Sequence, residues 1–64
     1  MAITLKAARV NAGLTQADVA KELKISKTTV HGYESYKISP GVVRAKELAK
    51  LFGMGIDEIL WGDE

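Results

Sequence analysis

Residues that start helices and residues that end them alternate along this chain at short intervals. A Ser or Thr hydroxyl accepts from the free N–H groups of a first helical turn, and glycine adopts the left-handed conformation that often follows a last turn. The candidate starts are Thr4, Thr15, Ser26 and Ser39-Pro40, and the candidate ends are Gly13 and Gly53. Because these signals follow one another so closely, every helix must be short.

Apolar residues recur at helical spacing between these signals, and no stretch alternates apolar and polar residues as a half-buried strand does. We therefore expect an all-α fold, a compact bundle of five short helices, in a single domain over residues 1–64. The expected helices cover residues 5–12, 16–24, 27–34, 40–52 and 55–61. Thr15 and Asp18 have the spacing of a capping box at the start of the second helix.

The composition excludes several classes of site. The 64 residues include no cysteine and one histidine, so disulfides and thiolate metal sites are impossible. His31 would need an orienting carboxylate and a nearby nucleophile to act in catalysis, and Ser26 and Ser35 are better explained as helix-end residues. We expect no enzyme activity, no cofactor and no small-molecule substrate.

No apolar run is long enough to cross a bilayer or to serve as a secretory signal. We expect a cytoplasmic protein without a membrane partner.

Charge is distributed unevenly along the chain. Residues 1–50 carry nine basic and four acidic side chains (9 − 4 = +5), whereas residues 51–64 carry four acids and no base, which gives the net charge of +1. A basic body with an acidic end suits a protein that turns one face toward phosphate. A chance asymmetry of an ordinary solvated surface would look the same.

The close succession of the second and third helices is the most informative feature. Only about three residues separate Leu23 from Lys27, and a turn that short makes the helices cross steeply, as in DNA-binding helix-turn-helix motifs. Such a crossing needs a small residue where the helices touch, and Ala20 supplies it. Ile25, Val30 and Tyr33 are apolar anchors for the turn and the third helix.

An ordered set of short motifs extends over nearly the whole chain. It comprises Gly13-Leu14-Thr15-Gln16, Val19-Ala20, Ile25-Ser26, the Val30 to Glu34 stretch, Pro40, Leu48-Ala49, and Phe52-Gly53 followed by Ile56-Asp57-Glu58-Ile59-Leu60. This set resembles the phage-repressor (XRE) family of helix-turn-helix domains, which includes Cro-type regulators. The resemblance implies a lambda-repressor-like fold. It also implies a Cro-like or repressor-like transcriptional regulator that binds a double-stranded DNA operator sequence-specifically, as a homodimer at least on DNA.

The resemblance also implies roles for individual residues. The segment of about 27–35 would enter the major groove, with Lys27 and Thr28 as the main base readers and Ser26 and His31 beside them. Backbone contacts are implied for Gln16, Ser35, Tyr36 and Lys37, and Thr15 is counted among the DNA-binding residues beside Gln16. Arg9 and Glu34 match positions that form a structural ion pair between the first and third helices.

Three residues depart from the family pattern. Lys24 stands at a turn position where glycine is common, so a left-handed conformation there would cost about 1 kcal/mol. Gly32 removes a side chain from a position that we expect on the outward face, together with Thr28 and His31. Tyr36 replaces a small turn residue. These departures predict sparse base readout.

The end of the chain leaves two alternatives open. Met54, Ile59 and Trp61 either cap the core or form a dimer seam, because Met and aromatic residues are enriched at interface cores. The acidic end and Trp61 also suit a second function, a protein-interaction module on the same fold, such as an antitoxin or an adaptor.

Overall fold

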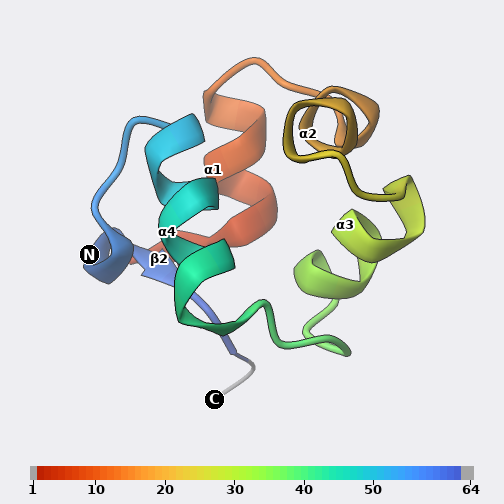
Figure 1. Cartoon of the computed structure of the whole chain (residues 1–64). Coiled ribbons are helices and arrows are strands. Elements are labelled where there is room, and N and C mark those ends of the chain that lie inside the picture. Colours follow the sequence, from red (N-terminus) through yellow and green to blue (C-terminus); the bar gives the residue numbers. More distant parts are fainter. Residues whose placement is uncertain (1, 63–64) are drawn as a thin grey trace.

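The computed structural model describes residues 2–62, and four α-helices make up most of this part (Figure 1). They are α1 (Leu5–Asn11), α2 (Gln16–Leu23), α3 (Lys27–Glu34) and α4 (Gly41–Leu51). The other elements are the short strands β1 (Ile3–Thr4) and β2 (Ile59–Leu60) and a 3-10 turn, η1 (Ile56–Glu58). In Figure 1, α2 and α3 lie together on one side of the molecule and α4 on the other. None of the helices within residues 2–62 has the length and apolar character needed to cross a bilayer.

The prediction of a fifth helix at 55–61 is wrong, and so is the prediction that the chain has no strand. Only Ile56–Glu58 turns, after which Ile59 pairs with Ile3 and Leu60 with Thr4 in a parallel two-stranded ladder. The start of the chain therefore supplies hydrogen-bond partners that satisfy the backbone here without a helix. Local patterning cannot reveal such a pairing, because the partners lie at opposite ends of the sequence.

Side-chain caps start the first three helices as expected. The hydroxyls of Thr4 and Ser26 each accept from a backbone N–H three residues on, at 3.1 Å. Thr15 and Asp18 form both hydrogen bonds of the capping box, at 3.0 and 2.9 Å. The expected cap at Ser39 is wrong, because Pro40 occupies the cap position and Ser39 lies one residue too early.

Left-handed residues end the helices and turn the chain. Gly13 and Gly53 have φ values of 76° and 68°, as their positions predict. Lys24, between α2 and α3, has a φ of 58°, so the strained conformation expected there is present. The next residue, Ile25, donates its N–H to the Ala20 carbonyl at 2.9 Å, which ties the turn to α2.

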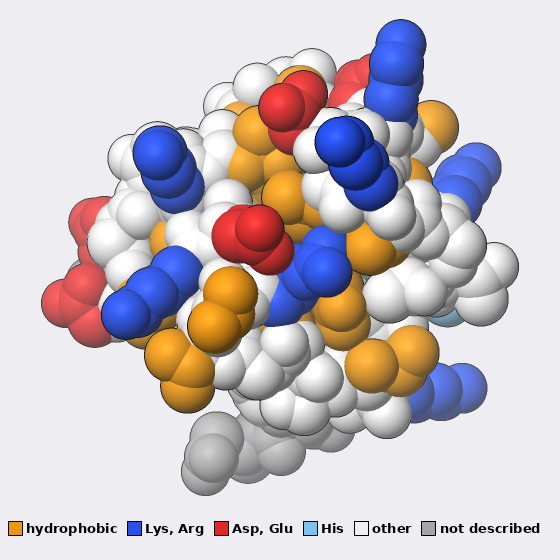
Figure 2. Space-filling model, viewed as in Figure 1, with side chains coloured by type: hydrophobic (Ala, Val, Ile, Leu, Met, Phe, Trp, Pro, Cys, Tyr) orange, Lys and Arg blue, Asp and Glu red, His pale blue; other side chains and the backbone are white. Residues whose placement is uncertain are grey.

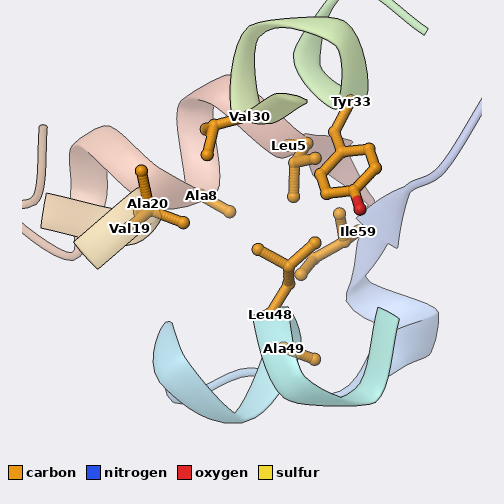
Figure 3. Close-up of a cluster of buried hydrophobic side chains, with 9 residues drawn as sticks. All are labelled: Leu5, Ala8, Val19, Ala20, Val30, Tyr33, Leu48, Ala49 and Ile59. Carbon is orange, nitrogen blue, oxygen red and sulfur yellow. The ribbon is translucent and has the colours of Figure 1, made fainter. Parts of the chain in front are cut away.

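One apolar core joins all four helices and β2 (Figure 3). Its buried members are Leu5, Ala8, Val19, Ala20, Val30, Tyr33, Leu48, Ala49 and Ile59. Three of them are alanines, and small side chains let the short helices approach closely. Ala20 of α2 and Val30 of α3 are both buried where the sequence predicts that the helix-turn-helix closes.

The capping box makes stability depend on pH in the acid range. Hydrogen bonds from the Thr15 backbone and hydroxyl to the Asp18 carboxylate lower the pKa of that carboxyl below its ordinary value of 3.8. A group with a lowered folded-state pKa contributes stability above its unfolded pKa and loses that contribution as pH falls through the folded pKa. We therefore expect wild-type protein to lose more unfolding free energy than Asp18→Asn between about pH 5 and pH 2. Urea titrations at each pH measure this, and parallel curves for the two proteins would contradict it.

Candidate nucleic-acid interface

A tight turn, Lys24 to Ser26, sets α3 across α2. Figure 1 shows α2 nearly end-on and α3 more from the side, so the two axes cross steeply. The left-handed Lys24 redirects the chain, and the Ser26 hydroxyl caps α3 at once by accepting from the Thr29 N–H. This is the helix-turn-helix geometry that the short separation predicts.

The side chains of α3 divide into an inward and an outward set. Val30 and Tyr33 are buried in the core, whereas Lys27, Thr28 and His31 are exposed. Helical spacing sends these two sets to different sides. One side of α3 thus holds the helix to the domain, and the other presents an ammonium, a hydroxyl with a methyl group, and an imidazole.

Gly32 is covered by the loop that follows α3, so the expected outward position of this residue is wrong. The loop after α3 folds back, and the N–H groups of Lys37 and Ile38 donate to the Gly32 carbonyl at 3.0 and 3.2 Å. The Ile38 side chain then covers α3 so closely that a Cβ on residue 32 would lie 2.8 Å from Ile38 Cγ1. The glycine makes room for this loop and does not leave an open reading position.

A buried polar network joins α1, α2 and α3. The Arg9 guanidinium forms an ion pair with the Glu34 carboxylate and also donates to the Leu14 carbonyl at 2.8 Å. Gln16, the first residue of α2, donates its side-chain amide to Glu34 at 3.0 Å. The Arg9 and Glu34 side chains are only 10% and 5% exposed, so both charges depend on these partners. The network fixes α3 relative to the start of α2.

Comparison with known proteins agrees with this geometry. The family model described as helix-turn-helix matches residues 5–59. The chain belongs to this helix-turn-helix family. It is 37% identical over 60 residues to the HTH-type transcriptional activator BcrR of Enterococcus faecalis, a match that covers 94% of this chain and 29% of that protein.

A second relative is closer in size to this helix-turn-helix chain. It is an HTH-type transcriptional regulator of Methanocaldococcus jannaschii, 40% identical over 55 residues, with 86% of this chain and 83% of that protein covered. The chain thus spans most of one relative and less than a third of the other. No solved structure gives a significant match.

The remaining site residues expected from the helix-turn-helix resemblance surround the start of α2 and the end of α3. Thr15 and Gln16 lie at the start of α2, with the Thr15 hydroxyl already engaged in the capping box. Ser35 and Lys37 are exposed after the end of α3. Tyr36 is left-handed, with a φ of 63°, and its hydroxyl donates to the Leu60 carbonyl at 3.2 Å. Tyr36 therefore ties this loop to β2.

Lys6 is a neighbour of this surface that the sequence reasoning missed. It is exposed on α1 and lines a hollow together with Gln16, His31 and Ser35. The ion-paired side chains of Arg9 and Glu34 also line this hollow. The signal was present in the spacing, because Lys6 precedes Arg9 by three residues and such residues share one side of a helix. The expected ion pair of Arg9 thus also indicated the side on which Lys6 lies.

The residues suggested for a dimer seam do not form one exposed surface. Ile59 is 3% exposed in the core, so its place in a seam is wrong. Met54 and Trp61 are half-buried against the core, and the Trp61 indole N–H donates to the Ile56 carbonyl at 2.8 Å. Of the acidic end, Asp57 and Glu58 belong to η1, while Asp63 and Glu64 lie outside the described residues.

Removing Glu34 should be far more harmful than removing an exposed acid. Glu34→Ala leaves Arg9 without its counter-ion, and we expect a loss of about 3 kcal/mol of unfolding free energy. Glu47→Ala is the matched control, because Glu47 is exposed and its ion pair with the half-buried Arg44 is worth less than about 1 kcal/mol. Chemical denaturation measures both. Equal losses would show that the Arg9–Glu34 pair does not hold the motif together.

Proposed function

We propose that this domain binds double-stranded DNA as part of a transcriptional regulator, with α3 as the recognition helix in the major groove. The observation that carries the proposal is the exposed side of α3, which presents Lys27, Thr28 and His31 while a buried network holds the helix from behind. The major groove of B-DNA admits one α-helix. Rigid support keeps such a helix in register with the bases.

Base readout would depend on the first turn of α3. The Lys27 ammonium can donate to guanine O6 and N7, and the Thr28 methyl group can contact the methyl of thymine. His31 lies one turn further on, beside these two residues, where its N–H can donate to the DNA backbone. Residue 32 is a glycine that Ile38 covers, so α3 offers no side chain to the bases at this position. Base readout is therefore confined to few positions.

Phosphate contacts would position the helix. Gln16 keeps one amide hydrogen free beside its bond to Glu34, and it lies at the start of α2, where the helix dipole favours an anion. Lys37 adds an exposed ammonium beyond α3. Between Ser26 and Lys37 the one acidic residue is Glu34, which is paired with Arg9, so no free carboxylate opposes DNA along this segment.

A domain that only occupies DNA can repress transcription, because it excludes polymerase sterically. Repression is therefore the mode of regulation that DNA binding supports by itself. One relative, BcrR, is named an activator, and the match covers 29% of it. Activation is therefore a second mode, to which residues beyond the matched part would contribute.

We further propose that two copies bind one operator, with α4 at the contact between them. Val42 and Val43 are 70% and 75% exposed, more than any other large apolar side chain described within residues 2–62. Figure 2 shows hydrophobic side chains at the surface on the face where α4 lies, among basic and acidic ones. Lys46 and Glu47 follow Val43 by three and four residues, so a two-fold contact between α4 helices sets opposite charges near one another.

A protein-interaction module remains the second candidate. The observation in its favour is an apolar hollow beside Trp61, lined by Pro40, Val42, Ala45 and Ile56. A stoichiometric protein partner together with no DNA affinity at low salt would favour this module over the regulator.

Selection of bound sites from a random DNA pool, followed by gel-shift titration, tests DNA binding directly. We expect Lys27→Ala to cost about 1–3 kcal/mol on the selected site and to relax the preference at one base pair, whereas Lys37→Ala weakens all sequences alike. Matching half-sites about 34 Å apart are expected if two copies bind. Unchanged affinity and preference in Lys27→Ala would contradict the placement of α3.

The dimer contact is tested with one substitution and its control. Val43→Glu should reduce the stoichiometry on an operator from two copies to one, or abolish cooperative binding, because a carboxylate enters the apolar contact. Val10→Glu introduces the same charge at another exposed valine, on α1. Sedimentation of the protein–DNA complexes measures the stoichiometry. Two copies bound with unchanged cooperativity in Val43→Glu would exclude α4 from the contact.

A further inference from the structure

A hollow between α1 and α3 has the composition of an anion site. It is lined by Lys6, Arg9, Gln16, His31, Glu34 and Ser35. His31 belongs to the outward side of α3, so the hollow adjoins the surface that the proposed function places against DNA. Lys6 brings in a helix, α1, to which the expected contacts assign no part in DNA binding.

The charges of this hollow do not cancel. Its one carboxylate, Glu34, is held by Arg9 and by the Gln16 amide. The Lys6 ammonium is exposed and has no ion-pair partner in the part of the chain that the structure describes. With Glu34 balanced by Arg9, the hollow keeps the positive charge of Lys6 and gains the N–H of His31 as a donor.

We propose that this hollow binds a phosphate of the DNA backbone, with Lys6 as the charged contact and His31 as the hydrogen-bond donor. The inference rests on the proposed function and adds α1 to the DNA-binding surface. His31 lies four residues after Lys27, which is about 6 Å further along α3, so it approaches the edge of the groove when Lys27 reaches the bases. Phosphates line that edge, and a compact, hydrated ammonium suits one of them.

The contact would contribute to affinity without contributing to sequence preference. Each phosphate neutralised releases condensed counterions, which steepens the fall of affinity with salt by about 0.9 in a double-logarithmic plot. Lys6 is exposed on the surface of α1, so its replacement leaves the core and the Arg9–Glu34 pair in place.

The test compares salt titrations of DNA binding for wild type, Lys6→Ala and Lys21→Ala. Lys21 is an exposed lysine on α2 that does not line the hollow, and it controls for the loss of one positive charge. We expect Lys6→Ala to lower the salt slope by about 0.9 and the affinity by about fivefold at physiological salt, equally for the selected site and for competitor DNA. Lys6→Arg should retain the wild-type slope.

Operators with a single neutral methylphosphonate locate the contact. At one position the neutral linkage should weaken wild type and leave Lys6→Ala unaffected, and His31→Ala should show a reduced response at the same position. A slope for Lys6→Ala equal to that for Lys21→Ala, with wild type still binding DNA, would overturn the phosphate site and leave the proposed function intact. No DNA binding by wild type at low salt would overturn both.

Discussion

The ion pair between Arg9 and Glu34 is the interaction on which the rest of the structure depends. It crosses from α1 to α3 and is extended to α2 by the Gln16 amide and to the preceding turn by the Leu14 carbonyl. Two short helices that meet through a few small apolar side chains have little area to define their crossing. Directional hydrogen bonds between charged groups define it, because a shift of either helix would leave a charge without a partner.

This network also determines what α3 can present to a ligand. The inward side of α3 contacts the rest of the domain through Val30, Tyr33 and Glu34. The side chains that stay exposed to solvent are therefore Lys27, Thr28 and His31. Glu34, the acid that would otherwise repel DNA, is the one that binds α1 and α2. The same pair therefore supports the helix and removes a negative charge from the candidate interface. Stability and function share one arrangement here.

Contacts between distant segments complete the scaffold behind α3. β2 lies beside β1, and the Tyr36 hydroxyl donates to the Leu60 carbonyl, so the loop after α3 is tied to the end of the fold. Ile38 covers Gly32 as part of this closure. These contacts explain why Gly32 is not outward and why Ile59 is in the core. Both corrections arise from chain segments that approach one another only after folding.

By itself, the sequence determined the four principal helices, the capping of the first three, the left-handed Lys24 and the family, because each depends on neighbouring residues or on a short spacing. The tertiary structure alone decided the parallel ladder that replaces a fifth helix, the covering of Gly32, the burial of Ile59 and the hollow that brings Lys6 to His31. The physical reason is that caps and turns depend on hydrogen bonds between residues that are close in the sequence. Burial and charge proximity depend instead on which distant segments share the same space.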